Sequence, residues 1–330
     1  MMFENLCVVI IGGTGFIGQR IIERLNILSE GKCEIRALVR DETKMKDMPN
    51  VTKIVGSLPD VPKELFPQKP NIVIHFGTKN INNDGSGFEL VNVIGTKNIM
   101  ESLPESTVGV IYGSSFSVYG QGSLCNVNEK KSINPETLLA ISRAEAECII
   151  MEEMRKRGKS ALVLRPRFIL GKDDEYTMPK LVKAYMHHIN IGTGKQISTY
   201  IEADDYAKIV CELVSYILKN AQNSQYLNTA INIGYKRPVS LKELHEIFNE
   251  VFEYKWQCYI PITGRFTDFL KATGIKVFEK LGIILELGAF SHSADVTLLE
   301  SIIGSGIVGK DPKTIIYNLL MDKYHIDLQI

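Results

Sequence analysis

The sequence predicts an α/β fold, in which a doubly wound parallel sheet is followed by a smaller α+β C-terminal part. Short, almost wholly apolar runs alternate with amphipathic helical patterns through the first two thirds of the chain. A glycine-rich turn joins the first apolar run to the first helical pattern, and after residue 171 helical patterns predominate. Strands that are apolar on both faces and separated by helices are typical of a parallel sheet covered on both sides.

The expected elements of the sheet follow one another at short intervals. Apolar runs rich in β-branched residues predict strands at residues 6–11, 34–39, 52–55, 72–76, 109–114 and 160–164. Amphipathic patterns predict helices at residues 16–28, 88–103 and 136–157. In the first helix Ile17, Ile21, Leu25 and Leu28 share the face that would pack on the sheet.

The rest of the chain predicts a second, mainly helical unit. Helical patterns cover residues 178–188, 204–218, 240–252 and 312–324, and short strands are expected near 197–202 and 230–233. Ser240 is placed to cap one of these helices. We expect one domain of residues 1–171, which also takes in about 199–234, and a second of residues 172–198 and 235–330.

Composition excludes several classes of protein. The 330 residues carry 38 acidic and 38 basic side chains, so there is no electrostatic signature of a nucleic-acid partner. No apolar run approaches the ~18 residues of a membrane span, and no secretory signal is expected. The six cysteines lack zinc spacing, so no metal site is expected. Cys7, Cys148 and Cys211 lie in apolar or helical stretches, which predicts buried, reduced thiols in a cytoplasmic protein.

The glycine-rich turn indicates a dinucleotide site of the Rossmann type. Gly12, Gly15 and Gly18 have the spacing Gly-x-x-Gly-x-x-Gly, directly after a strand and before a helix. Side chains at these positions would block close approach of a pyrophosphate, which the free N–H groups at a helix N-terminus bind.

The end of the second strand bears on the choice of cofactor. An acidic residue there accepts hydrogen bonds from the ribose of NAD, whereas arginine accommodates the phosphate of NADP. Here Val39 stands where the acid is expected, and Arg40 follows it. The sequence therefore favours NADP over NAD, with the alternative that Arg40 pairs with the neighbouring Asp41.

Further motifs resemble the extended short-chain dehydrogenase/reductase superfamily, which contains NAD(P)-dependent epimerases, dehydratases and reductases. Beside the glycine turn they cover residues 73–78, 92–98, 113–120, 164–171, 203–207 and 232–234. The resemblance implies that the cofactor contacts a set of residues along the carboxyl edge of the sheet. These are Gly12, Thr14, Gly15, Phe16, Ile17, Gly18, Arg40, Ser57, Leu58, Phe76, Gly77, Thr78, Asn92, Arg143 and Pro166. Ser57 replaces the aspartate that usually holds the adenine in this superfamily.

The helix at residues 136–157 departs from the superfamily pattern. Relatives carry Tyr-x-x-x-Lys there, and this chain has Leu139 and Arg143 at the two positions. A spacing of four places both side chains on one helix face. Leucine transfers no proton, and loss of a positioned acid typically costs ~10²–10⁴-fold in rate. Arg143 keeps the positive charge with a different geometry.

The resemblance implies that Ser115 orients the substrate, and Tyr119 is one candidate for the missing proton donor. Cys125 and Glu129 are weaker candidates, each with an ordinary loop role as its alternative. After residue 171 only Arg237 and Arg265 join Arg167 as arginines for a diphosphate.

The largely apolar segment 260–290 resembles the hydroxysteroid-dehydrogenase branch and indicates an apolar or carrier-bound small-molecule substrate. Its alternative is a domain core or a dimer interface. Relatives often form homodimers through the helices corresponding to 88–103 and 136–157.

The sequence thus predicts an NADP-dependent oxidoreductase, of carbonyl-reductase or epimerase/dehydratase type, with a remodelled active site. Two alternatives stay open. One is a catalytically inactive NAD(P)-binding sensor or partner subunit, and the other is a non-redox isomerase or cyclase on the same fold.

Overall fold

The computed structural model describes residues 4–80, 86–186, 188–220, 228–253, 257–261, 264–275, 277–278, 282, 285 and 288–325. A seven-stranded sheet has the order β12-β7-β5-β4-β1-β2-β3, and every neighbouring pair in it is parallel. The order reverses between β1 and β4, so the sheet is doubly wound and the predicted fold class is confirmed. Its strands are β1 (Cys7–Ile11), β2 (Glu34–Val39), β3 (Val51–Val55), β4 (Asn71–His75), β5 (Thr107–Gly113), β7 (Ser160–Pro166) and β12 (Thr229–Ile233).

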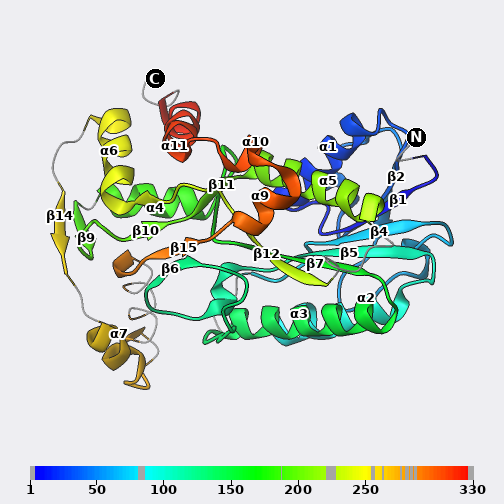
Figure 1. Cartoon of the computed structure of the whole chain (residues 1–330), viewed down its shortest axis with the longest axis horizontal. Helices are drawn as coiled ribbons and strands as arrows, with labels where there is room; N and C mark the ends of the chain where they lie inside the picture. The colour runs from blue at the N-terminus through cyan, green and yellow to red at the C-terminus, as the bar shows by residue number, and fades with distance from the viewer. Residues whose placement is uncertain are drawn as a thin grey trace.

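Helices cover both faces of this sheet (Figure 1). On one side α1 (Phe16–Leu28) packs beside α5 (Ala203–Asn220), and on the other α2 (Gly95–Ser102) packs beside α3 (Leu138–Lys156). Successive side chains of each strand point to opposite faces of the sheet, so the strands contribute to two separate hydrophobic cores. In β1, Val8 and Ile10 join the core under α1, whereas Val9 joins the core under α2 and α3.

Two of the expected elements, at residues 88–103 and 197–202, are each divided in the structure. Residues 88–103 form a π-helical segment, Glu89–Ile94, which continues into α2. Residues 197–202 form two strands in different sheets, β10 (Ile197–Ser198) and β11 (Tyr200–Glu202). The sequence Ile-Ser-Thr-Tyr-Ile-Glu of residues 197–202 carries no mark of the point where the chain changes its pairing partner.

Apart from β10 and β11, the short strands outside the main sheet were not anticipated. A four-stranded sheet has the order β13-β10-β15-β6, and two-stranded sheets join β11 with β8 and β14 with β9. The additional strands are β6 (Leu124–Val127), β8 (Phe168–Leu170), β9 (Ile189–Ile191), β13 (Val239–Ser240), β14 (Cys258–Ile260) and β15 (His292–Ala294). Strands of two to four residues leave too little periodicity for a sequence to reveal.

A third core lies in the C-terminal part of the chain. Its apolar side chains come mainly from α4 (Thr177–Met186), α6 (Leu241–Phe252) and α11 (Pro312–Leu320). Further helices are α7 (Gly264–Lys271), α9 (Thr297–Ile303) and α10 (Ser305–Val308). This helical core draws mostly on the residues expected to form the second domain.

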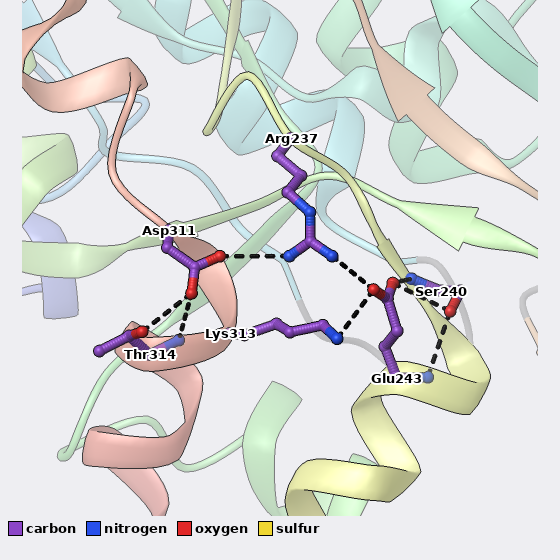
Figure 2. A network of polar contacts seen from close by, with 6 residues as sticks. All are labelled: Arg237, Ser240, Glu243, Asp311, Lys313 and Thr314. Atoms are coloured by element: carbon purple, nitrogen blue, oxygen red, sulfur yellow. Dashed lines mark hydrogen bonds and ion pairs between the residues drawn. The ribbon is translucent and has the colours of Figure 1, made fainter.

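Polar contacts tie the N-termini of α6 and α11 together (Figure 2). Ser240 and Glu243 form a reciprocal capping box at α6, which agrees with the expected N-cap. Arg237 binds both Glu243 and Asp311, and Asp311 caps α11 through the N–H of Thr314. Arg237 is therefore engaged in holding two helices in register.

The thiols follow the expectation in part. Cys7, Cys33 and Cys211 are buried and all six cysteines are free, but Cys148 is exposed because it lies on the outer face of α3. In the part of the chain that the structure describes, no helix is both long and apolar enough to cross a bilayer.

Candidate cofactor site and active site

The glycine turn between β1 and α1 packs too closely to admit side chains. Gly12 has φ +91°, and a Cβ there would lie 2.8 Å from the backbone nitrogen of Gly77. A Cβ on Gly18 would lie 2.2 Å from the carbonyl oxygen of Gly12. Gly15 is exposed, and as the N-cap of α1 it offers no side-chain hydrogen bond to the helix N-terminus. This cradle fits a dinucleotide pyrophosphate.

The loop after β4 forms the neighbouring wall of the cradle. Phe76 lies over Gly113, where a Cβ would come within 2.8 Å of the ring, and its ring also tilts against Tyr206 at 5.7 Å. A Cβ on Gly77 would lie 2.6 Å from the side chain of Ile11. The carboxyl ends of β1, β4 and β5 thus meet at the switch point of the sheet, where doubly wound folds bind ligands.

Arg40 leaves the end of β2 with its guanidinium exposed. It makes no hydrogen bond or ion pair with the described residues. Asp41 instead accepts hydrogen bonds from the backbone and the side chain of Thr43, at 3.0 and 2.6 Å. The alternative pairing of Arg40 with Asp41 is therefore not formed, and Arg40 is open to a ligand.

The remaining expected cofactor residues lie along the same edge. Ser57 is exposed, Leu58 packs under Gly95, and Pro166 ends β7 in a buried position. Thr14 accepts a hydrogen bond at its carbonyl oxygen from Gln19, and Ile17 is buried in α1.

Asn92 fixes the loop after β4 against the helix layer. Its Oδ1 accepts from the backbone of Lys79 at 2.7 Å, and its Nδ2 donates to the carbonyl of Lys79 and to the hydroxyl of Ser142. Asn92 is fully buried within the π-helical segment. All its polar atoms face protein partners, so it shapes the loop that carries Gly77 and Thr78.

Arg143 spans the ends of two strands. Its Nη1 donates to the carbonyl oxygen of Ser114 at 2.5 Å, and its Nη2 donates to Oδ1 of Asn80 at 2.6 Å. Thr78 donates to the same atom of Asn80 at 3.0 Å. The Nε of Arg143 is buried and has no hydrogen-bond partner among the described residues. The sequence did not single out Asn80, because no motif marks a loop residue as the partner of a helix residue 63 positions further along the chain.

Leu139 lies one turn before Arg143, partly buried in the first turn of α3. Ser115 follows β5, and its Oγ accepts hydrogen bonds from the backbone and the hydroxyl of Ser117. Ser115 and Arg143 thus flank the carboxyl end of β5, because Arg143 bonds the carbonyl of Ser114.

Tyr119 belongs to a buried polar network. Its hydroxyl donates to Oδ1 of Asn232 at 3.0 Å and accepts from Nη1 of Arg165 at 3.0 Å. Arg165 also binds Glu147 through two nitrogens, and Ser114 donates to the same carboxylate. Burial raises the pKa of Tyr119, against the lowering effect of Arg165. Tyr119 as a whole is 2% exposed, and its hydroxyl both donates and accepts a hydrogen bond within the protein.

Two further phenols near Arg143 have unengaged hydroxyls. Those of Tyr112 in β5 and Tyr206 in α5 are buried without a hydrogen-bond partner among the described residues. Burial raises the pKa of both, and the charge of Arg143 acts in the opposite direction. They were not among the sequence candidates, because their positions are indistinguishable from core aromatics.

The weaker candidates take structural or open positions. Glu129 accepts from the backbone of Asn232 at 2.8 Å, and burial raises its pKa. Cys125 is exposed beside Ser123. The described residues contain no group of three His, Cys, Asp or Glu arranged to hold a metal. Part of the apolar segment 260–290 lies outside the described residues; within the described part, Phe269 and Val277 are exposed.

Known proteins resemble this chain in sequence and in fold. GDP-6-deoxy-D-talose 4-dehydrogenase of Aggregatibacter actinomycetemcomitans is 26% identical over 258 residues, which cover 75% of this chain and 82% of that protein. Sterol-4-alpha-carboxylate 3-dehydrogenase (decarboxylating) of Bos taurus is 30% identical over 208 residues, or 58% of this chain and 56% of that protein. The structure of UDP-glucuronic acid 4-epimerase from Bacillus cereus in complex with NAD covers 96% of this chain and 99% of its own, with a TM-score of 0.71 and 14% identity.

The model of the NAD-dependent epimerase/dehydratase family matches residues 8–234. That match takes in the glycine turn, the strands of the main sheet and the polar network around Tyr119. The chain belongs to the NAD-dependent epimerase/dehydratase family.

Proposed function

We propose that this protein is an NADP-dependent oxidoreductase of the carbonyl-reductase or epimerase/dehydratase type, with a remodelled active site. The observation that carries the proposal is the open guanidinium of Arg40 beside an intact glycine cradle. Arginine binds a phosphate through two parallel hydrogen bonds, and Asp41 does not compete because it caps Thr43. NAD is the second candidate, since UDP-glucuronic acid 4-epimerase of Bacillus cereus was solved with NAD.

The residues of the chain divide the work as follows. Gly12 to Gly18 hold the pyrophosphate, Arg40 holds the ribose phosphate, and Arg143 supplies positive charge beside the nicotinamide ribose. Bound NADP supplies or accepts a hydride. Ser115 orients the reacting oxygen of the substrate, with a water or a substrate group as proton donor. Tyr119 serves as a structural residue in this proposal, because its hydroxyl already donates one hydrogen bond to Asn232 and accepts one from Arg165.

The second candidate function is a dinucleotide sensor without turnover. It is favoured by Leu139, whose side chain cannot transfer a proton. It is also favoured by Arg143, because both its Nη1 and its Nη2 donate to oxygen atoms of the protein. A non-redox isomerase or cyclase on the same scaffold is the third. Turnover that continues after removal of the nicotinamide would favour it.

Binding and turnover of the same preparation test these functions. Calorimetry should show tighter binding of NADPH than of NADH, and Arg40→Ala should weaken NADPH roughly 10–150-fold while leaving NADH unchanged. NADPH consumption is then followed with 4-keto sugar nucleotides and apolar ketones. Turnover that changes strongly in the double variant Leu139→Tyr, Arg143→Lys supports the oxidoreductase. Tight binding with no consumption of NADPH supports the sensor, and equal affinity for NADH overturns the choice of cofactor.

We also propose that two copies associate through the outer faces of the π-helical segment and α3. An apolar groove of about 470 Å³ lies there, lined by Val93, Pro135, Ile141, Ala144, Glu145, Cys148 and Ile149. Leu90, Ile94 and Leu138 are exposed beside it, at 48%, 40% and 63%. Four-helix contacts of this kind bury apolar faces that single copies leave in water.

Sedimentation velocity tests the dimer. The wild-type protein should sediment as a dimer, and Ile94→Glu with Leu138→Glu should give monomers. Ile27→Glu is the matched control, because Ile27 is equally apolar and 67% exposed on α1. A monomeric wild type, or a dimer that survives both substitutions, contradicts the proposed interface.

The substrate and the compartment complete the proposal. The names of GDP-6-deoxy-D-talose 4-dehydrogenase and UDP-glucuronic acid 4-epimerase favour a small sugar-nucleotide substrate, and sterol-4-alpha-carboxylate 3-dehydrogenase favours an apolar one. The six free cysteines are typical of the reducing cytoplasm. Turnover with 4-keto sugar nucleotides but not with apolar ketones, or the reverse, decides between the substrate classes.

A further inference from the structure

Arg167 follows Pro166 directly, at the carboxyl end of β7 and beside the four-stranded sheet. Its Nη2 meets Nδ1 of His292 at 3.2 Å, and its guanidinium lies over the ring of Phe168 at 4.5 Å. Its Nε is buried without a partner, while the residue as a whole keeps a partly exposed surface. No carboxylate among the described residues pairs with it.

Arg165, two residues earlier on the same strand, shows how this fold accommodates a buried cation. Arg165 binds Glu147 through Nε at 3.1 Å and Nη2 at 2.5 Å, and it donates to Tyr119 through Nη1 at 3.0 Å. All its nitrogens are engaged, and its charge is neutralised. Arg167 has one polar partner where Arg165 has a complete set.

The neighbours of Arg167 cannot supply the missing charge. Burial and the charge of Arg167 lower the pKa of His292 to about 3, against a backbone hydrogen bond with Gly122 that raises it. Burial raises the pKa of Tyr200, whose ring stacks on Phe168 at 5.5 Å. Burial also lowers the pKa of Arg167 to about 10, which leaves it protonated at neutral pH. A full positive charge therefore remains uncompensated.

We propose that Arg167 binds an anionic oxygen group of the substrate, a carboxylate or a phosphate, close to the reacting carbon. His292 and Phe168 hold the plane of the guanidinium, and a planar fork is suited to two parallel hydrogen bonds from one anion. Desolvating a cation without a counter-ion opposes folding, and a ligand anion would offset that cost. That Arg167 lies near the reacting carbon rests on the proposed function, in which the adjacent Pro166 contacts the cofactor. The binding of an anion by Arg167 does not depend on that function.

Anion binding and stability together test this site. Sodium phosphate and sodium acetate are titrated calorimetrically, at constant ionic strength made up with chloride, into wild type, Arg167→Met, Arg167→Lys and Arg155→Met. Arg155 is exposed near the end of α3 and serves as the matched control. At least one anion should bind wild type and the control, and Arg167→Met should weaken that binding at least tenfold. Arg167→Lys should retain part of it, because a point charge lacks the fork.

Thermal unfolding in chloride separates this role from a structural one. Arg167→Met should unfold at or above the wild-type temperature, whereas Arg165→Met should unfold well below it. Preference for phosphate or for acetate identifies which group the substrate carries. The proposal is overturned if neither anion binds wild type, if Arg167→Met binds as wild type does, or if Arg167→Met unfolds well below wild type. Each titration is run with and without NADPH, so that a failure of cofactor binding is seen separately.

Discussion

Nη2 of Arg143 in α3 donates to the side-chain oxygen of Asn80 at 2.6 Å, and Nη1 of the same guanidinium donates to the carbonyl of Ser114. Arg143, which we expect at the position of the lysine in the superfamily motif, thus joins the loop after β4 to the end of β5. Lysine, with a single ammonium group, cannot reproduce the spacing of this fork.

Replacement of Arg143 should therefore affect both the loop and the cofactor. Arg143→Lys should keep the positive charge and lose the contact with Asn80, which should speed hydrogen exchange at the amides of Thr78 and Asn80. Arg143→Met should also raise the Kd for NADPH by about five- to tenfold, the value of one lost hydrogen bond. Unchanged exchange in Arg143→Lys would show that the fork does not hold the loop.

Removal of the hydroxyl of Tyr119 should lower the stability of the protein, whereas removal of the hydroxyl of Tyr206 should not. Tyr119→Phe leaves Oδ1 of Asn232 and Nη1 of Arg165 buried without their hydrogen-bond partner, which should lower the free energy of unfolding by about 1–3 kcal/mol. Tyr206→Phe removes a buried hydroxyl that has no partner among the described residues, so stability should stay equal or rise by about 1 kcal/mol.

The same pair of variants also bears on the missing acid. Denaturant unfolding is measured together with NADPH consumption, and Tyr317→Phe in α11 controls for loss of a hydroxyl elsewhere. Loss of turnover in Tyr206→Phe at unchanged stability would identify Tyr206 as the acid and contradict a purely structural role for it.

Arg165 and Glu147 form a buried ion pair, and replacing only one of the two residues should strongly lower the stability of the protein. Their side chains are 7% and 5% exposed. Arg165→Met leaves the carboxylate of Glu147 buried and uncompensated, which should lower the free energy of unfolding by about 3–5 kcal/mol. Urea unfolding measures this, and the double variant Arg165→Met, Glu147→Met should recover much of the loss. A double variant as unstable as the single one would rule out charge burial as the cause.

The network in Figure 2 predicts a pH dependence of stability. Burial alone would raise the pKa of Glu243, but hydrogen bonds from the backbone of Ser240 and from Lys313 outweigh it and lower the pKa to about 2. A carboxyl with a lowered folded pKa stabilises the protein above its unfolded value of about 4.3, and this contribution is lost as the pH falls through about 2.

Glu243→Gln should therefore be less stable than wild type at neutral pH, by on the order of 1 kcal/mol, and the two should converge toward pH 2. Glu246→Gln, an exposed position on the same helix, should run parallel to wild type. Thermal unfolding at a series of pH values measures the difference. A gap that stays constant with pH would exclude Glu243 as the titrating group.

The sequence by itself determined the fold class, the course of the main sheet and the tight glycine turn between β1 and α1. These rest on local features: strands apolar on both faces, helices with one apolar face, and glycines where no Cβ fits. The boundaries of α1 and β2 follow directly from such patterns. That Leu139 and Arg143 replace the tyrosine and the lysine of the superfamily motif stays a prediction, which rests on their spacing within one helix.

Only the tertiary structure decided which polar groups are engaged and which are open. Arg40 and Arg143 look alike in the sequence, but one is exposed to solvent and the other binds Asn80 and Ser114. Arg165 and Arg167 are two residues apart, but only Arg165 meets a carboxylate, because Glu147 approaches it from α3. Partners of this kind come from distant segments, and no local pattern in the sequence records which side chains the fold brings together.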